Sequence, residues 1–196
     1  MDLDEFAERG VVNLPIVLQG IYNVMAELLK RGYMPEDVQP TNFLVDRKTL
    51  KVALKDYSSI FRLEDDPYTK RQFRRHISTY SDIFIPPERR HGIVPADHLV
   101  VCFGLLIYFL TTTRSPAWKN CDRVCRMMFH YSDRRLKPLW NSMSEIIAQL
   151  NSPIGKLIKL CLARTSDDRI GFAGIKELLQ DNEKDTADES HDSFAA

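Results

Sequence analysis

A helical repeat of hydrophobic residues is the first strong pattern along the chain. The repeat comprises Val17, Leu18, Ile21, Val24, Met25, Leu28 and Leu29. Residues three and four positions apart fall on one face of a helix, so this spacing predicts a long amphipathic helix with one buried face. Asn13 is the candidate N-cap, Pro15 lies in the first turn, and Gly32 is the expected stop.

A polar loop and two short strand-like runs follow this helix. The loop covers residues 34–42, and the two runs cover residues 43–45 and 50–54. Residues 46–49 between them have the composition of a tight turn, so we expect a two-stranded antiparallel element. Apolar residues at every second position of the second run predict one buried face.

The rest of the chain is predicted to be one long loop followed by helices. No sustained period is present from Asp56 to Glu88, and loops of this length are usually functional. The apolar run from Leu99 to Leu110 falls short of the roughly 20 residues that span a bilayer, so we expect a buried central helix and no membrane partner. The expected helices cover about 97–111, 122–130, 139–150 and 152–162, and a last one carries Ile175, Leu178 and Leu179.

Net charge, the N-terminal sequence and the cysteines indicate which partners and which cellular compartment to expect. The 27 basic and 27 acidic residues cancel, so no bulk positive field favours nucleic acid or an anionic membrane. The N-terminus lacks the layout of a secretory signal, which predicts an intracellular location, cytoplasmic or nuclear. The cysteines form no disulfide framework and are expected to be reduced and mostly buried. They are Cys102, Cys121, Cys125 and Cys161.

Three polar motifs occur in a fixed order around the predicted elements. They are Pro35-Glu36-Asp37-Val38-Gln39-Pro40-Thr41-Asn42, Asp56-Tyr57-Ser58 and Pro86-Pro87-Glu88. From about Leu3 to Leu179, the chain resembles the C-terminal lobe of a eukaryotic protein kinase, whose signature is H-R-D-x-x-x-x-N, D-F-G and A-P-E. The resemblance implies an α+β, mainly α fold over residues 1–180, with a small two-stranded β element and no N-terminal lobe. Residues 181–196 are predicted to be an acidic, disordered tail.

The resemblance also implies a role for individual residues. Phosphoryl transfer needs a carboxylate near the attacking hydroxyl and oxygen ligands for magnesium. Asp37 would take the hydroxyl proton, while Asn42 and Asp56 would hold Mg²⁺ together with ATP. The family pairs the A-P-E glutamate with a later arginine, which implies a partly buried ion pair of Glu88 and Arg169. Independently of the resemblance, Asp37 and Asn42 are common turn formers, and Asp56 could simply end a strand.

Several positions depart from the family's pattern in ways that weaken catalysis. Gln39 stands where many serine/threonine kinases carry a lysine, so it supplies no positive charge to the transferring phosphate. Pro35 and Glu36 replace the histidine and arginine of H-R-D, and the glutamate would repel a phosphate on the activation segment. Ser58 replaces the glycine of D-F-G, which restricts the backbone there. Leu99 replaces a buried aspartate that braces the catalytic loop.

Two functions remain open at this point. No Gly-rich phosphate loop and no nucleotide-gripping lysine precede the first helix in this sequence. This favours a truncated, catalytically impaired domain that acts as a protein-interaction module, because the nucleotide-facing surface is partly apolar and needs cover. The expected protein partner would bind through this exposed lobe face or through the activation segment. The alternative is the C-terminal part of an active ATP-dependent Ser/Thr-type protein kinase whose ATP-gripping lobe lies upstream or on a partner.

Three other clusters have simpler interpretations. The basic run over residues 70–76 is expected to be a solvated loop, given the zero net charge. Cys121 and Cys125 lie one helical turn apart near His130, and packing is favoured over zinc binding. The apolar stripe over residues 140–150 is expected to pack in the core.

Overall fold

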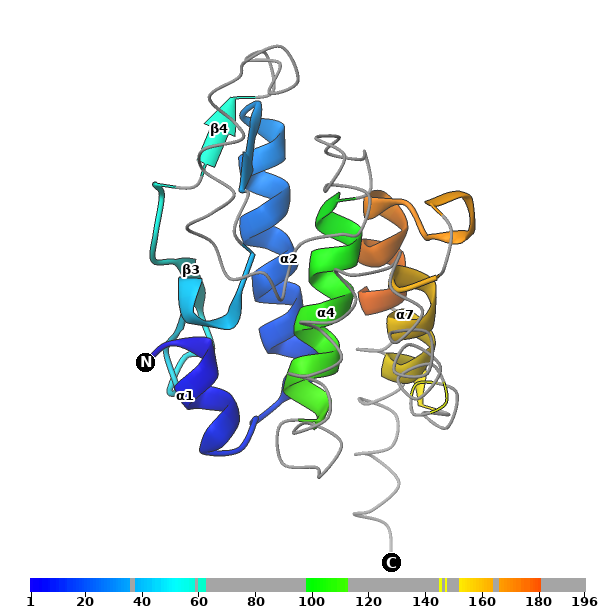
Figure 1. Cartoon of the computed structure of the whole chain (residues 1–196). Coiled ribbons are helices and arrows are strands. Elements are labelled where there is room, and N and C mark those ends of the chain that lie inside the picture. The colour runs from blue at the N-terminus through cyan, green and yellow to red at the C-terminus, as the bar shows by residue number, and fades with distance from the viewer. Residues whose placement is uncertain are drawn as a thin grey trace, which may run out of the picture.

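The computed structural model describes an α+β fold. Helices make up most of the described residues. The described residues are 1–35, 38–58, 60–62, 98–112, 145, 147, 152–163 and 166–180. The N-terminal elements are α1 (Leu3–Glu8), α2 (Leu14–Lys30), β1 (Tyr33–Pro35), the 3-10 turn η1 (Pro40–Asn42), β2 (Phe43–Val45), β3 (Val52–Leu54) and β4 (Ile60–Arg62). The later ones are α4 (His98–Thr112), α7 (Pro153–Cys161), the 3-10 turn η5 (Ser166–Asp168) and a C-terminal helix over residues 172–180. In Figure 1, α2 and α4 run side by side through the centre, with the strands on one side and α7 on the other.

The strands form two antiparallel pairs. β2 pairs with β3, with Phe43 opposite Leu54, which confirms the predicted two-stranded element. β1 pairs with β4, with Pro35 opposite Ile60. This second pair was not predicted, and the prediction of an unbroken loop after Asp56 is wrong at β4. Strands of three residues are too short to show a period, and a proline in β1 argues against a strand.

Helix α2 has the predicted extent, but its N-cap differs from the prediction. Asn13 occupies the N-cap position with a left-handed backbone, φ 54° and ψ 60°, and its side chain forms no capping hydrogen bond. An N-cap side chain accepts from the N–H of the second or the third residue of the helix. Pro15 is the second residue of α2 and has no N–H to donate. At the other end, the chain leaves the helix through Gly32, which has φ 77°, as predicted.

The turn of the β2–β3 hairpin is longer than predicted. The sequence pattern began the second strand at Leu50, whereas β3 begins at Val52. Leu50 has a left-handed φ of 55°, and its N–H donates to the carbonyl of Asp46 at 2.7 Å. The Asp46 carboxylate accepts from the N–H groups of Lys48 and Thr49 at 2.8 and 3.2 Å, so it holds the turn together. Hydrophobic alternation cannot reveal such a turn, because it depends on backbone hydrogen bonds.

Helix α4 is the predicted buried central helix. Its residues from Leu99 to Leu110, apart from Gly104, are at most 5% exposed. At Gly104, a Cβ atom would lie 2.6 Å from the Cβ of Cys161 and 2.9 Å from a methyl group of Leu162. This glycine therefore allows α4 and α7 to pack at close range.

One aromatic side chain joins three helices. Tyr22 on α2 stacks on Phe172 of the C-terminal helix at a centroid distance of 4.8 Å, and it meets Phe103 of α4 edge to face at 6.4 Å. Aromatic pairs at these distances are worth about 0.5–1.5 kcal/mol each beyond the area that they bury. Tyr22 is therefore a central packing residue of the described core.

The remaining helices agree with the sequence pattern, except at the N-terminus. Ser152 caps α7 by accepting the N–H of Gly155 at 3.1 Å. Ile175 and Leu179 bury one face of the C-terminal helix. Helix α1 was not predicted, although Asp2 caps it by accepting the N–H of Glu5 at 2.9 Å.

Several sequence predictions concern residues that lie outside the described part. These are the helix over 122–130, most of the one over 139–150, the basic run over 70–76, the tail from 181, and Cys121, Cys125 and His130. Cys102 and Cys161 are free and buried, as predicted, and burial raises the pKa of the Cys161 thiol. Ile147, the described apolar member of the 140–150 stripe, is buried. No helix in the described ranges is long and apolar enough to cross a membrane.

Candidate functional site

The β2–β3 hairpin brings two of the predicted site residues, Asn42 and Asp56, to one end of the sheet. Asn42 directly precedes β2, and Asp56 follows β3 by two residues. The N–H of Lys55 donates to the carbonyl of Asn42 at 2.8 Å, which extends the ladder one step beyond the Phe43–Leu54 pair. The backbones at 42 and 55 are therefore in direct contact, and Asp56 is the next residue.

Asn42 is the buried polar residue of this site. It is 8% exposed, the only polar or charged side chain in the buried class within the described ranges. Its N–H donates to the carbonyl of Gln39 at 3.0 Å, and Pro40 opens η1 with the fixed φ that favours a turn. Buried amides are almost always hydrogen-bonded, which fixes their orientation. Asn42 therefore presents a positioned side chain at the start of β2.

Asp56 is the charged residue of this site. Its Oδ1 accepts the N–H of Ser58 at 2.8 Å, which closes a local turn at the surface. This backbone hydrogen bond lowers the pKa of the Asp56 carboxyl below its ordinary value of 3.8, helped by the Ser58 hydroxyl and by the nearby Lys55 ammonium. The carboxylate is therefore ionised at neutral pH, as both a turn former and a metal ligand would be.

Of the two candidate residues in the loop before Asn42, the structure describes Gln39 but not Asp37. Gln39 is half-buried and extended, with φ −120° and ψ 158°. Asp37 and Glu36 lie outside the described residues, so the role of Asp37 as proton acceptor stays a prediction. Val38, between Asp37 and Gln39, is fully buried and anchors the loop to the core.

Arg169 occupies a part-buried position after η5. Its Nε donates to the carbonyl of Ala163 at 2.9 Å, which ties the η5 segment to the end of α7. Glu88 lies outside the described residues, so the ion pair of Glu88 and Arg169 stays a prediction.

The donor set at the hairpin end has the chemistry that magnesium uses. Mg²⁺ takes one or a few hard oxygen ligands from protein and the rest from water and phosphates. Asn42 and Asp56 would supply an amide and a carboxylate oxygen. Within the described ranges, no three His, Cys, Asp or Glu side chains form a group that could hold a metal ion. A magnesium site here would therefore need ligands beyond the Asn42 amide and the Asp56 carboxylate, such as water and phosphate oxygens.

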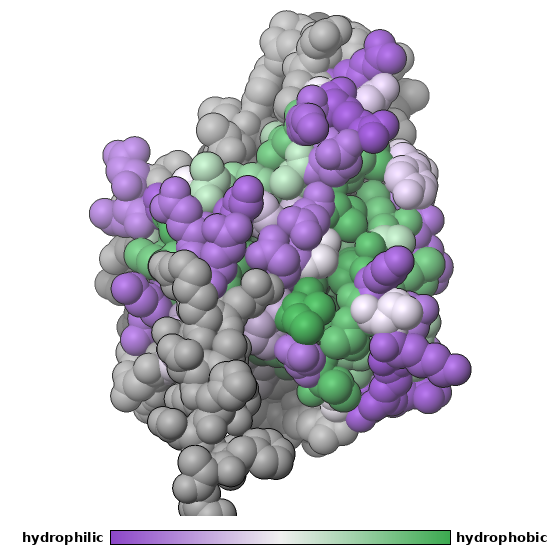
Figure 2. Space-filling view, turned by 180° about the vertical axis from the view of Figure 1, so that it is seen from behind, coloured by the Kyte–Doolittle hydropathy of each residue, from purple (hydrophilic) through white to green (hydrophobic). Residues whose placement is uncertain are grey.

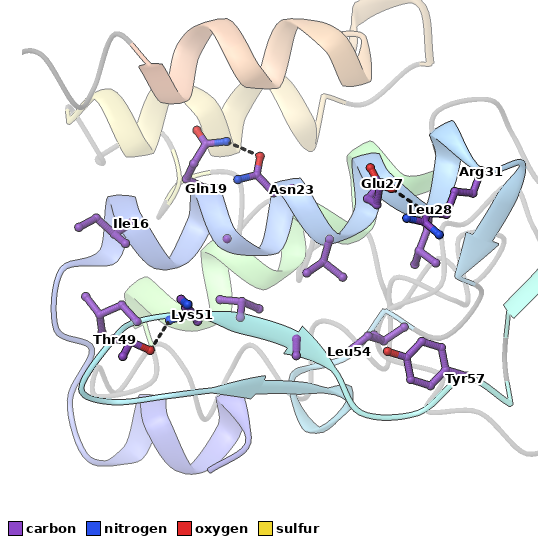
Figure 3. A pocket seen from close by; sticks show the side chains of 15 residues that line it. Ile16, Gln19, Asn23, Glu27, Leu28, Arg31, Thr49, Lys51, Leu54 and Tyr57 are labelled. Atoms are coloured by element: carbon purple, nitrogen blue, oxygen red, sulfur yellow. Dashed lines mark hydrogen bonds and ion pairs between the residues drawn. The ribbon is translucent and has the colours of Figure 1, made fainter.

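A second feature is an elongated groove between α2 and the β2–β3 hairpin, with a volume of ≈ 780 Å³. Figure 3 shows Ile16 and Thr49 at one end and Leu28, Leu54 and Tyr57 at the other. Seen from behind, the molecule has a hydrophobic strip bordered by hydrophilic side chains (Figure 2). Apolar side chains line both walls of the groove: Ile16, Val24 and Leu28 on α2, and Leu50, Val52 and Leu54 on the hairpin.

This groove was not predicted, although the sequence carries a signal for it. Ile16, Gly20, Val24 and Leu28 are spaced by four, which makes a second apolar stripe along α2. Val24 and Leu28 are half-buried rather than buried, and Ile16 is 43% exposed. Gly20 lies at the bottom, where a Cβ atom would stand 2.6 Å from a methyl group of Val52. The second stripe therefore faces the hairpin, at the edge of the main core.

No protein-family model matches the chain, and no curated protein matches its sequence. The functional interpretation therefore depends on the motifs themselves and on the geometry of the described residues.

Proposed function

We propose that this chain is a protein-kinase-like C-terminal lobe that acts as a protein-interaction module and transfers phosphate poorly or not at all. The observation that carries the proposal is the 2.8 Å hydrogen bond from Lys55 to Asn42. It joins the loop that ends in Asn42 to the segment that begins at Asp56. Two residues that share one Mg²⁺–ATP complex must lie close together, and these two motifs, 14 positions apart in the sequence, do so.

Weak catalysis follows from the residues that surround these ligands. Gln39 offers a neutral amide where a lysine would stabilise the transferring phosphate, and losing one such electrostatic donor costs about 10²–10³ in rate. Glu36 adds a negative charge next to the proposed proton acceptor, Asp37. Both differences leave the negative charge of the transferring phosphoryl group less well stabilised.

An interaction role is supported by an open apolar face on the hairpin. Leu44 and Ala53 lie opposite each other in the β2–β3 register, and both are exposed, Leu44 by 37%. Exposed apolar residues that lie side by side are typical of surfaces that another molecule covers. In the family, this lobe has a second lobe above it, so we expect a protein partner at this face.

A phosphotransfer assay on the full chain tests the proposal. The purified protein is incubated with Mg²⁺, ATP and a mixture of Ser-, Thr- and Tyr-containing peptides, beside an Asp37→Ala variant. We expect no difference in phosphate incorporation between the two proteins. Incorporation that Asp37→Ala abolishes would overturn the proposal of a non-catalytic module.

The alternative, the C-terminal part of an active ATP-dependent protein kinase, is favoured by the ionised carboxylate of Asp56, a prerequisite for metal binding. Bound Mg²⁺ and ATP would supply the phosphoryl group and neutralise its charge. Mixing the chain with a kinase N-terminal lobe that contains a Gly-rich loop and a lysine should then produce magnesium-dependent phosphorylation. Binding of ATP by the mixture without any phosphorylation would rule this alternative out.

A further inference from the structure

The groove between α2 and the β2–β3 hairpin has the dimensions of a site for an extended peptide. From Ile16 to Arg31, α2 rises about 22 Å, at 1.5 Å per residue. An extended segment of roughly six or seven residues has the same length. The volume of ≈ 780 Å³ lies within the range typical of ligand sites.

Both walls of the groove offer apolar anchoring positions that are open to solvent. Ile16 is 43% exposed at one end, and Tyr57 is 64% exposed at the other. Val24 and Leu28, which also line the groove on α2, are half-buried. Tyrosine is one of the residues that contribute most to binding energy at interfaces, and exposed aliphatic side chains add apolar area that a bound segment can bury.

The charges in the groove favour an acidic occupant. On the α2 wall, Glu27 and Arg31 neutralise each other in an ion pair of 2.7 Å. On the hairpin wall, Lys51 lines the groove and forms no ion pair with any residue that the structure describes. The same turn adds the exposed charges of Arg47 and Lys48, of which the Asp46 carboxylate offsets one. The groove therefore has a net positive charge at the end where the turn lies.

We propose that this groove binds a linear segment of a partner protein that carries alternating apolar residues and an acidic group, with the acidic group at Lys51. The inference rests on the proposed interaction role and adds a second surface to the Leu44–Ala53 face, together with the chemistry of its occupant. Apolar side chains of the segment pack between α2 and the hairpin, and its carboxylate pairs with Lys51.

Binding of three labelled eight-residue peptides to the full chain, followed by fluorescence anisotropy, tests this proposal. The peptides share alternating Val and Leu residues and differ in two terminal residues, which are Glu, Gln or Lys. We expect the Glu peptide to bind about five-fold or more tightly than the Gln peptide, and the Lys peptide to bind most weakly. Equal affinities, or no binding of any peptide at millimolar concentration, would overturn the proposal.

Matched variants separate the groove from the surrounding surface. Lys51→Glu should reverse the preference between the Glu and Lys peptides, whereas Lys48→Glu, on the same turn but outside the groove, should reduce this preference without reversing it. Ile16→Glu should weaken the Gln peptide by about ten-fold, since an apolar contact is lost, and the Glu peptide by more, because the new carboxylate also repels it. Val12→Glu is the control, because Val12 is 51% exposed and does not line the groove. Circular dichroism and thermal unfolding confirm that each variant is folded.

Two further outcomes would contradict the proposal. Self-association in sedimentation experiments that Ile16→Glu abolishes would assign the groove to a second copy of this chain. Equal loss of binding in Ile16→Glu and Val12→Glu would show that the groove is not the site. The peptide-binding experiment contains no nucleotide, so its result does not depend on whether the chain transfers phosphate. Phosphotransfer activity would overturn the proposed function, whereas failure to bind the peptides would overturn only the proposal for the groove.

Discussion

At the scale of single residues, the candidate site combines a buried amide with an exposed carboxylate. Asn42 owes its position to burial and to the η1 turn, whereas Asp56 is held by the N–H of Ser58. The two residues therefore respond differently to substitution. A change at Asn42 disturbs the core, while a change near Asp56 alters mainly the local turn and the charge.

The first prediction concerns the pKa of Asp56 in a Ser58→Gly variant, which restores the glycine of the family's motif. Glycine keeps the backbone N–H that is the main cause of the lowered pKa and removes only the hydroxyl. We expect the Asp56 pKa to rise slightly and to stay below 3.8 in a ¹³C NMR titration. Because the pKa of Asp56 is lower in the folded state, its ionised carboxylate stabilises the fold at pH values above 3.8. This contribution disappears as the pH falls through the folded-state pKa. A pKa at or above 3.8 would show that the hydroxyl is the main cause.

The second prediction concerns the cap of α7. Ser152→Ala removes the acceptor of the Gly155 N–H and should lower the free energy of unfolding by about 1 kcal/mol. Chemical denaturation with urea measures the effect. Lys156→Ala, at an exposed position of the same helix, is the control and should be nearly neutral. Equal effects of the two substitutions would mean that the cap contributes nothing to stability.

At the scale of elements, the close contact of α4 and α7 depends on one missing side chain. Gly104→Ala places a methyl group 2.6 Å from the Cβ of Cys161, a distance that requires the helices to move apart. We expect a destabilisation of about 1–3 kcal/mol in thermal or urea unfolding, typical of overpacked cores. Gly171→Ala is the control, because a Cβ there meets no atom within 4 Å. If both substitutions cost the same, the α4–α7 contact does not limit stability.

Long elements could be predicted from the sequence, whereas short ones could not. Helix α2 repeats the amphipathic pattern over several turns, α4 is a continuous apolar run, and α7 begins at the signal of Ser152 and Pro153. Strands β1 and β4 have three residues each, and they are stabilised by their pairing with each other and by packing of Met34 and Ile60 on the core. Asn13 and Leu50 adopt left-handed backbones that depend on neighbouring hydrogen bonds. No local pattern reports such contacts.

The same distinction applies to the candidate site. The motifs led to Asn42 and Asp56 through their spacing, but the hydrogen bond from Lys55 to Asn42 depends on the register of the hairpin. The groove was missed because Val24 and Leu28 fit equally well in a buried stripe. Which of two apolar faces a helix buries depends on where its neighbours lie, and Gly20 and Val52 become neighbours only in the folded chain.

At the scale of the whole molecule, the kinase-like assignment requires one contact between distant parts of the sequence. Glu88 and Arg169 are 81 positions apart, and the resemblance pairs them in a partly buried ion pair. Arg169 also donates to the carbonyl of Ala163, so a single substitution would remove two interactions at once. A double-mutant cycle isolates the contribution of the pair alone.

The last prediction is the outcome of that cycle, with Glu88→Gln, Arg169→Gln and the double variant compared by urea unfolding. Each single variant leaves one charge partly buried and without its partner, which costs about 3–5 kcal/mol where the burial is complete. The double variant should therefore be less destabilised than the sum of the single ones, with a coupling energy of at least about 1 kcal/mol. Arg89→Gln, next to Glu88 in the sequence, should show no coupling to Arg169→Gln. Strictly additive effects of Glu88→Gln and Arg169→Gln would mean that the two residues do not meet, and the kinase-like assignment would lose its one long-range requirement.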